Sequence, residues 1–537
     1  MKVKKAKQKR DRYEMHKYWG KKPAKDLAAL IARYSDVNEV VMDPFSGYGV
    51  FCCEAYLMNR NVISNDLNPV SIFIQRQLLE SEISIDKFRF EWKAIESELF
   101  PFIDDWYGFE VDGMRYQAVS VLRDKKDKIL KCKYTPRDLG KQKKYVYSDQ
   151  EASAHREKEE NFEIEDWFPT SELLENSRIS VGPGFTIADI FTVRTLACHA
   201  RLLYLINEIS SGKEKELFKL TFTSNLANCS KLVPPIKSRD EMAPGAWMTG
   251  YYVGPTYLEN NVLHYFRNRV HKTLRGKSEY LEMARRENDL FSSNGPVRRG
   301  EIRSFGEFSE DTVAYLLLNG DSKCLLLPDD SVDYVFTDPP YGDSVPYFEQ
   351  SAIWNNWLGF TADFENEIVI SDSKKREKDA ARYRKDIESA FREIYRILKP
   401  GRHFSLTYHS LSGREWKAIT NGCLLAGFEL ESYSWIKQVT FTPRQINRAK
   451  TVKGDVLMTL KKPMVPSAEY NSQTESEARE FILGFFHQFI DRGKDTNAIF
   501  LKLIHAIFEN KIILPDIDAY QVLKDHFVFD GNCWRQK

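Results

Sequence analysis

Short apolar runs alternate with amphipathic segments in the first eighty residues, a pattern typical of an α/β fold. Leu27 and Ile31 lie on one face of a predicted helix, and the segment 39–42, apolar after its first residue, predicts a short buried strand. A helix over 50–59 and a second strand over 61–65 follow. The order is therefore strand, helix, strand, with a glycine-containing turn after the first strand.

The same pattern resumes near residue 315. An amphipathic helix is predicted over 377–398, where a Pro-Gly pair stops it. Strands are predicted over 315–318, 332–336, 403–409, 428–436 and 455–460. Together the two stretches predict a seven-stranded, mostly parallel α/β sheet with one reversed edge strand.

The segments between these stretches are longer and more charged. Helices are predicted over 73–100 and 192–218, and the acidic stretch 151–175 has few long apolar runs. We interpret this region as a large mixed insertion without a catalytic centre. After a polar linker at 467–477, further apolar clusters predict a C-terminal helical appendage.

Length and charge limit the classes of protein. A chain of 537 residues exceeds what one hydrophobic core usually supports, so two or three domains are expected. Its 78 basic and 77 acidic residues leave a formal charge of +1, which gives no support to nucleic-acid binding by itself. Basic residues gather in 1–22 and 123–144, and each cluster either contacts phosphate or is simply solvated.

Cysteine usage and the lack of long apolar runs indicate the compartment. The 8 cysteines include no Cys-x-x-Cys pair, which argues against a zinc site and a disulfide framework and fits a reducing cytoplasm. No run approaches the roughly 18 apolar residues of a membrane span. The basic N-terminus is not followed by the apolar core of a signal peptide. We therefore expect a cytoplasmic protein that contacts no membrane.

The turn after the first predicted strand has the features of a cofactor cradle. Its sequence is Asp43-Pro44-Phe45-Ser46-Gly47-Tyr48-Gly49. The glycines let the backbone approach a ligand closely, and Asp66, at the end of the next strand, is placed to accept hydrogen bonds from ribose hydroxyls. A dinucleotide site shares these features, but its fingerprint has a third glycine where this chain has Cys52. A tight turn without a ligand also fits the pattern.

A second motif follows the predicted strand 332–336, with the sequence Asp338-Pro339-Pro340-Tyr341. Two prolines cannot continue a strand ladder, so these residues should lie just past the strand's end, where open α/β sheets bind ligands. Asp338 and the Pro339 carbonyl can accept both hydrogens of one exocyclic amine, which favours a pyramidal nitrogen able to attack. Tyr341 offers a face on which a base can stack. We interpret the motif as an amine methylation site.

With both motifs in view, the chain resembles the S-adenosylmethionine-dependent amino-methyltransferases of DNA. Their F-x-G-x-G motif is matched by residues 45–49, and their Asp-Pro-Pro-Tyr motif by residues 338–341. More narrowly, the chain is similar to a group of large bacterial methylases that open with an H-K-Y-W box, here 16–19, and continue the catalytic motif into Val-Pro-Tyr, here 345–347. The resemblance covers residues 10–80 and 312–462.

This resemblance implies S-adenosylmethionine as the cofactor and assigns its binding residues. Asp66 would hold the ribose, and Asp321 would contact the adenine. The methionine part would lie against His16, Tyr18, Trp19, Asp43, Pro44, Phe45, Ser46, Gly47 and Gly49.

The resemblance also implies the catalytic residues. Asp338 and the carbonyl of Pro339, followed by Pro340, would take the target amine, and Tyr341 would stack on the extruded base. No metal is implied, because in-line attack on a sulfonium carbon needs mainly positioning and the exclusion of water.

Several of these residues also have plainer interpretations. His16 could be a surface histidine beside a basic arm, and Asp321 could simply begin a turn. Asp343 could only balance the charge of the site. Tyr347 and Phe348 could clamp a base, but a place in the core is the simpler hypothesis.

The resemblance implies a Rossmann-like methyltransferase domain in two parts, residues 1–80 and 316–463. The insertion 81–315 would recognise the DNA target, and residues 464–537 would form the helical C-terminal region. The expected reaction is methyl transfer to the N6 of adenine in double-stranded DNA, in restriction-modification or phage defence, with nuclease or defence proteins as candidate partners. The alternatives are N4-cytosine methylation, methylation of an RNA base or a protein amide, and a DNA-binding subunit without catalysis.

Overall fold

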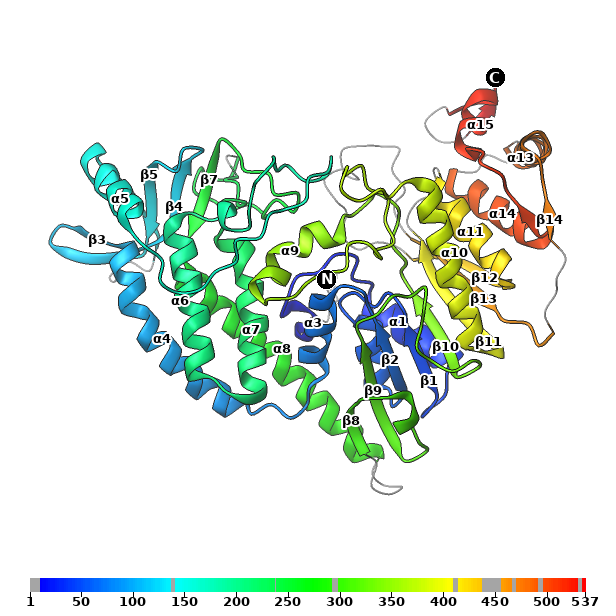
Figure 1. Ribbon diagram of the computed structural model, residues 1–537, viewed down its shortest axis with the longest axis horizontal. Coiled ribbons are helices and arrows are strands. Elements are labelled where there is room, and N and C mark those ends of the chain that lie inside the picture. The colour runs from blue at the N-terminus through cyan, green and yellow to red at the C-terminus, as the bar shows by residue number, and fades with distance from the viewer. Residues whose placement is uncertain are drawn as a thin grey trace, which may run out of the picture. The chain divides into compact units, whose positions relative to one another are not determined.

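The computed structural model shows two compact units (Figure 1). Unit 1 comprises Met1–Trp19, Phe73–Leu290 and Pro346–Ala362, and unit 2 comprises Gly20–Ile72, Phe291–Val345 and Asp363–Lys537. The predicted insertion falls largely in unit 1, and the predicted domain boundaries stay a prediction. The structure describes residues 10–136, 141–236, 238–291, 298–408, 414–436, 455–465, 470–490, 496–529 and 534–537.

Parts of three sequence features lie outside these described residues. They are residues 1–9 of the basic arm, 137–140 of the second basic cluster and 467–469 of the predicted linker. Within the described ranges, every helix is too short or too polar to cross a membrane.

Unit 2 is built around an eight-stranded sheet with the spatial order β12-β13-β11-β10-β1-β2-β9-β8. Neighbouring strands are parallel, except that β13 runs antiparallel to both β11 and β12. The predicted α/β fold with a parallel-rich sheet is therefore confirmed. The strands are β1 (Val40–Asp43), β2 (Asn61–Asn65), β8 (Arg298–Ile302), β9 (Thr312–Leu318), β10 (Val332–Thr337), β11 (Leu398–Tyr408), β12 (Glu429–Ile436) and β13 (Asp455–Lys461).

Two details of the predicted sheet are wrong. The described sheet has eight strands rather than seven, because β8 extends it beyond β9 as a further parallel strand. The reversed strand is not at the edge, since β13 lies between β11 and β12. An apolar run shows that a strand is buried, but it does not show which strands will be its neighbours.

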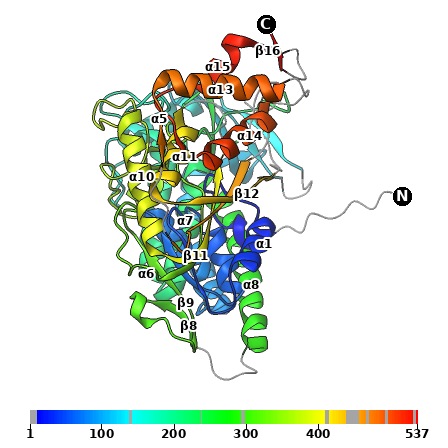
Figure 2. The ribbon, with the colours of Figure 1, turned by 90° about the vertical axis from the view of Figure 1, so that its right-hand side faces the viewer.

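Among the described helices of unit 2 that flank the sheet, all but the one over 414–426 follow the predicted pattern, which gave no helix there. They are α1 (Ala24–Tyr34), α2 (Val50–Leu57), α10 (Ala380–Ile397) and α11 (Arg414–Ala426). In α10 the residues Tyr383, Ile387 and Phe391 share one buried face, and the Asp379 side chain caps the first turn by accepting a hydrogen bond from the Arg382 N–H at 2.7 Å. Helices α10 and α11 pack against each other along the sheet (Figure 2).

The C-terminal part of unit 2 contains the predicted helices together with short strands that the sequence did not predict. Helix α14 packs against α11 and the edge strand β12, and the hydrophobic core continues from the sheet into these helices (Figure 2). The elements are β14 (Asn471–Ser472), α13 (Glu475–Ile490), α14 (Thr496–Glu509), β15 (Ile512–Ile513), α15 (Ala519–His526), β16 (Phe527–Phe529) and β17 (Trp534–Gln536).

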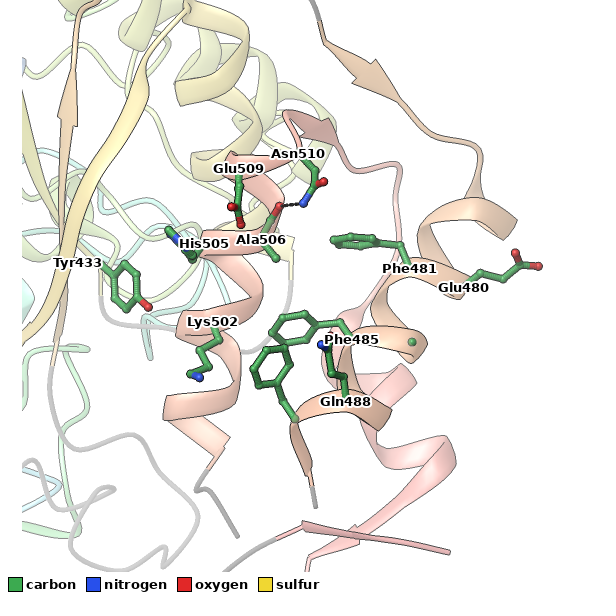
Figure 3. Close-up of a pocket in the computed structure, with 12 residues that line it drawn as sticks. Tyr433, Glu480, Phe481, Phe485, Gln488, Lys502, His505, Ala506, Glu509 and Asn510 are labelled. Atoms are coloured by element: carbon green, nitrogen blue, oxygen red, sulfur yellow. Dashed lines mark hydrogen bonds between the residues drawn. The ribbon is translucent and has the colours of Figure 1, made fainter. Parts of the chain in front are cut away.

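A hollow of about 580 Å³ lies between α13, α14 and Tyr433 of β12 (Figure 3). The rings of Phe485 and Phe489 stack there with centroids 4.5 Å apart, and the Lys502 Nζ lies 4.6 Å from the Phe489 centroid. None of the residues predicted to bind cofactor or target lines this hollow.

Unit 1 combines long helices with a five-stranded antiparallel sheet. Helix α6 packs against α4 and α7 (Figure 1), and in the sheet β4 pairs with β3, β5 and β7, while β6 pairs with β5. The helices are α4 (Ile85–Tyr107), α5 (Asp149–Asn161), α6 (Val193–Ile209), α7 (Gly212–Leu226), α8 (Val262–Phe291) and α9 (Tyr347–Trp357). The strands are β3 (Gly108–Val111), β4 (Met114–Asp124), β5 (Ile129–Tyr134), β6 (Lys143–Val146) and β7 (Thr256–Asn260).

Two long helices predicted in this region are each divided. The segment 73–100 contains the end of α3 (Pro69–Leu79) and most of α4, and the break precedes Ser84, which caps α4 by accepting from the Lys87 N–H at 3.2 Å. The segment 192–218 contains α6 and part of α7, separated by Ser210 and Ser211, and α7 begins at Gly212, whose φ of 65° lies in the left-handed region. Apolar periodicity continues across both breaks, so the pattern alone did not reveal them.

Candidate active site

The sheet of unit 2 gathers the ends of several strands at one edge. Strand β1 lies between β10 and β2, and β9 is next to β2. Because these strands are parallel, the turns that follow them begin at the same edge, where open α/β sheets bind ligands. The antiparallel strand β13 starts there too, since Val456 lies opposite Tyr408, the last residue of β11.

The glycine turn after β1 is held in a fixed shape by its own hydrogen bonds. Gly47 and Gly49 have φ values of 51° and 82°, which favour glycine. The Gly49 N–H donates to the Ser46 carbonyl at 2.8 Å, and the Ser46 hydroxyl donates to the Asn65 carbonyl at 2.9 Å. The turn therefore closes against the end of β2 and opens α2 with Gly49.

Asp66 belongs to this turn rather than standing apart from it. One carboxylate oxygen accepts from the Gly47 N–H at 2.8 Å, and the other accepts from the Asn68 N–H at 2.9 Å. Burial raises the pKa of Asp66, although these backbone hydrogen bonds oppose the rise. The carboxylate thus joins the glycine turn to the segment after β2, and its role toward a ribose stays a prediction.

A second polar side chain, Asn65, fixes the turn against the loop after β9. Its Nδ2 lies 3.2 Å from the Pro44 carbonyl, 3.0 Å from the Gly320 carbonyl and 3.1 Å from the Ser322 hydroxyl. The Ser322 hydroxyl itself donates to the Pro44 carbonyl at 2.6 Å. These contacts connect the ends of β1, β2 and β9 directly.

Asp321 lies in the turn after β9, as its plainer interpretation predicts. Its Oδ1 accepts from the Lys323 N–H at 2.9 Å, and its Oδ2 lies 3.3 Å from the Lys323 ammonium. A carboxylate that accepts from the backbone two residues ahead is a common way to begin a turn. A contact with adenine is neither shown nor contradicted, and it stays a prediction.

Asp338 lies just past β10, and its carboxylate receives three donors. The Thr407 hydroxyl donates to Oδ1 at 2.7 Å, and the Tyr341 hydroxyl contacts the same oxygen. The Lys22 ammonium lies 3.0 Å from Oδ2 and also 2.8 Å from the Oδ2 of Asp455. Burial raises the pKa of Asp338. The Lys22 charge and the Thr407 hydroxyl act in the opposite direction, but the net change is an increase.

The rest of the Asp-Pro-Pro-Tyr motif is held by neighbouring strands and helices. The Tyr341 hydroxyl is 3.1 Å from the Thr407 carbonyl, and its ring meets Tyr408 edge-on with centroids 5.7 Å apart. The Tyr383 hydroxyl, from α10, donates to the Pro340 carbonyl at 2.7 Å. The motif is therefore a braced loop, and stacking of Tyr341 on a base stays a prediction.

A third carboxylate, Asp43, ends β1 between these two motifs. It accepts from the Thr337 hydroxyl at 2.9 Å and from the Phe45 N–H at 3.1 Å. Burial raises the pKa of Asp43 to about 8; these hydrogen bonds oppose the rise, and the nearby carboxylates of Asp338 and Asp66 add to it. Three carboxyl groups with raised pKa values thus lie at this edge of the sheet.

His16, Tyr18 and Trp19 belong to unit 1, where they pack around Trp354 of α9. The His16 and Trp354 rings meet edge-on at 4.7 Å, and the Trp19 and Trp354 rings are 5.1 Å apart. The His16 Nε2 lies 3.1 Å from the Thr223 hydroxyl. His16 is 2% exposed, so the interpretation as a surface histidine is wrong, and a cofactor role for the box stays a prediction.

The residues after the catalytic motif divide between core and surface. Phe348 is buried, which confirms the core hypothesis for that residue, and the half-buried Tyr347 stacks with Tyr18 at a centroid distance of 6.3 Å. Asp343 is exposed in the loop of unit 2. Its role in the charge balance of the site stays a prediction.

Sequence reasoning missed five side chains that organise this edge, which are Lys22, Asn65, Ser322, Thr407 and Asp455. The sequence weakly indicates two of them, since Asn65 ends a predicted strand and Lys22 follows the H-K-Y-W box. The other three carry none, because their partners are distant in the sequence.

The fold and this site define an α/β protein with a glycine turn and a carboxylate cluster at one edge of its sheet. No family model matches the chain, and no curated protein matches it in sequence.

Solved structures offer weak likenesses to parts of the chain. One is a protein of Thermus thermophilus, provisionally assigned as a DNA modification methylase and solved with S-adenosyl-L-methionine; it is 16% identical, with a TM-score of 0.17, over 36% of this chain and 64% of that one. This chain therefore covers slightly less than two thirds of that protein.

Two further likenesses have the same TM-score of 0.17. A SAM-dependent methyltransferase of Methanosarcina mazei is 11% identical over 33% of this chain and 86% of that one. The [4+2]-cyclase SpnF is 14% identical over 35% of this chain and 84% of that one.

Proposed function

We propose that this protein is an S-adenosylmethionine-dependent methyltransferase that acts on the N6 of adenine in double-stranded DNA. The observation that carries the proposal is the pairing of β1 with β10, which makes the glycine turn and the Asp-Pro-Pro-Tyr loop neighbours at one edge of the sheet. These are the two motifs on which the resemblance to the amino-methyltransferases rests. Asp43 and Thr337, which lead into the two motifs, are 294 residues apart in the chain, yet their side chains share a hydrogen bond.

The residues at this edge fit the proposed cofactor. The left-handed φ values at Gly47 and Gly49 let the backbone come close to a bound group. Asp43, Asp66 and Asp338 supply carboxyl groups whose pKa values burial raises. Burial disfavours the ionised form of these groups, and a ligand that carries positive charge and hydroxyl donors would stabilise that form. S-adenosylmethionine has an ammonium, a sulfonium and a ribose.

The chain's own residues would hold the target amine for attack. S-adenosylmethionine supplies an electrophilic methyl group on its sulfonium. Asp338 accepts one hydrogen of the amine, and the Pro339 carbonyl accepts the other. The amine nitrogen would attack the methyl carbon as its bond to sulfur breaks, and the cofactor would leave as a neutral thioether. The proton lost by the nitrogen would pass to the Asp338 carboxylate, which already accepts it in a hydrogen bond. Positioning and the exclusion of water are the main requirements of this step.

The choice of adenine rests on the leading residue of the catalytic motif. The resemblance implies that N4-cytosine enzymes more often have serine where this chain has Asp338. Action in restriction-modification or phage defence, with partner proteins, stays a prediction from the same resemblance.

The basic cluster of unit 1 needs a correction before it can support DNA binding. Arg123 is fully buried, and its guanidinium pairs with Glu159 and, at 2.6 Å, with Glu259. It therefore belongs to the interior and cannot contact phosphate. Likewise, Lys133 and Lys144 pair with Asp240 at 3.0 and 2.7 Å.

Four exposed lysines of this cluster remain candidates for phosphate contacts. Among the residues that the structure describes, none of the four forms an ion pair within 4.0 Å of a carboxylate. They are Lys125, Lys126, Lys141 and Lys143. Phosphate contacts set the register of a protein on DNA without specifying sequence, so we assign only that role to them.

Transfer of a radiolabelled methyl group tests the proposed function. The purified protein is incubated with labelled S-adenosylmethionine and, separately, with duplex DNA, RNA and a protein mixture. We expect label in duplex DNA with the parent protein and none with Asp338→Ala. Label in RNA or protein alone would favour the rival substrates, and an absence of label in all three would support a subunit without catalysis.

A further inference from the structure

One ammonium group connects the proposed amine acceptor to a second carboxylate. The Lys22 Nζ lies 3.0 Å from the Asp338 Oδ2 and 2.8 Å from the Asp455 Oδ2. The side chains of Lys22, Asp338 and Asp455 are 10%, 15% and 6% exposed. This is a buried ion triad, and none of the motifs discussed above explains why Lys22 and Asp455 should be there.

Rigid elements carry all three side chains. Lys22 precedes Pro23, which restricts the backbone of Lys22 and leads directly into α1. Asp455 is the first residue of β13 and lies opposite Ile436 in β12. Asp338 directly follows β10. The backbone positions of all three residues are therefore fixed, and the ion pair with Asp455 determines where the Lys22 ammonium can lie.

Donors from the described part of the chain leave Asp338 one acceptor position. An ionised carboxylate has about four lone-pair sites. Thr407 and Tyr341 occupy sites on Oδ1, and Lys22 occupies one on Oδ2. The remaining site matches what the proposed reaction requires, because one hydrogen of the amine goes to Asp338 and the other to the Pro339 carbonyl.

The charges around Asp338 have opposing effects on its ionisation. Lys22 from the segment before α1 lowers the pKa of Asp338, whereas Asp455 from β13 raises it. Among the residues that the structure describes, Tyr341 of its own loop and Asp43 at the end of β1 also interact with it. Burial works to lower the pKa of Lys22, but the two carboxylates raise it above its ordinary value, so the ammonium stays charged.

From this geometry we infer that Lys22, held in place by Asp455, is a positioning residue that keeps Asp338 ionised and oriented to accept the target amine. The inference rests on the proposed function. It assigns Lys22 no contact with substrate or cofactor, so its effect must be visible through Asp338.

The test compares Lys22→Met and Asp455→Asn with the parent in single-turnover methyl transfer to DNA across pH. The ionised acceptor is required, so the rate falls as pH drops through the pKa of Asp338. Removing Lys22 raises that pKa and moves the acid limb of the pH–rate profile, where the rate falls with falling pH, to higher pH. The rate on that limb should fall at least roughly tenfold, the low end of what an opposite charge within 4–6 Å produces. Asp455→Asn removes a negative charge but keeps an oxygen that can accept from Lys22, so it should move the limb to lower pH.

A matched control is Lys399→Met. Lys399 pairs with Asp333 at 2.7 Å, near the start of β10 and so at the other end of the same strand, although the Lys399 side chain is more exposed than that of Lys22. Its loss should leave the pH profile unchanged. If Lys22→Met keeps the acid limb of the parent, or if it weakens S-adenosylmethionine binding instead, the assignment of Lys22 as a positioning residue is overturned.

A second measurement needs no methyl transfer. Urea unfolding of the parent, K22M, D338N and the double variant forms a double-mutant cycle for the pair. K22M should lower the midpoint more in the parent than in the D338N background. Equal losses would refute the coupling. A parent protein that methylates no DNA but shows this coupling would refute the proposed function alone.

Discussion

The carboxylate of Asp66 gives the sharpest test of the cofactor site, because it can be studied without knowing the DNA target. We expect Asp66→Ala to weaken S-adenosylmethionine binding. The side chain accepts from the Gly47 N–H at 2.8 Å and from the Asn68 N–H at 2.9 Å, so its loss removes the support of the glycine turn as well as the predicted ribose acceptor.

The size of the effect follows from the kind of hydrogen bond that is removed. A hydrogen bond to a charged acceptor contributes about 1.5–3 kcal/mol. One such bond to the ribose corresponds to a weakening of roughly 10-fold to 150-fold in Kd. Distortion of the glycine turn adds to this loss. Asp66→Asn keeps one oxygen acceptor at the same position and should lose less than the alanine variant.

Isothermal titration calorimetry with S-adenosylmethionine measures these affinities directly. Asp329→Ala is the matched control, because Asp329 is an exposed acid in the loop before β10 and its partner, at 2.7 Å, is Arg396. The control should bind as the parent does. Unaltered affinity in Asp66→Ala would remove Asp66 from the cofactor site, and tighter binding of a nicotinamide dinucleotide by the parent would overturn the class of enzyme.

Three further predictions concern the acceptor, the buried acid and the DNA surface. Asp338→Ala and Tyr341→Ala should each abolish methyl transfer with little change in cofactor affinity. The first removes the acceptor of the target amine, and the second removes a stacking contact that contributes roughly 1–3 kcal/mol per base. Parental rates in either variant would show that the site is wrong. Because the pKa of Asp43 is raised to about 8, the folded state binds a proton that the unfolded state releases, so urea unfolding should show stability falling as pH rises from about 4 to 8. Asp43→Asn should reduce this slope, and an unchanged slope would contradict the assignment. Neutralising the four exposed lysines should flatten the salt dependence of DNA binding by up to about 0.9 for each phosphate partner removed, whereas the same change at the paired Lys133 should not. The four are Lys125, Lys126, Lys141 and Lys143.

Local patterns in the sequence predicted the framework of the site. The run 332–336 is apolar because β10 lies between β1 and β11, where both of its faces are buried. Pro339 and Pro340 end that strand, and Gly47 and Gly49 supply backbone conformations that other residues rarely adopt. These features depend on a few adjacent residues, so they can be recognised without a structure.

Contacts between distant residues could not be predicted in the same way. Lys22, Thr407 and Asp455 meet Asp338 only because β11, β13 and the segment before α1 reach the same edge of the sheet. The position of β13 was itself mispredicted. The burial of Arg123 was missed for the same reason, because its partner Glu259 lies on β7, far along the chain.

The central claim is the product, N6-methyladenine in duplex DNA, and mass spectrometry of digested nucleosides tests it most directly. DNA lacking modified bases is treated with the parent protein and S-adenosylmethionine, and Asp338→Ala serves as the inactive control. The account predicts N6-methyladenine with the parent and none with the variant. N4-methylcytosine alone, or N6-methyladenine at equal levels in both samples, would contradict it.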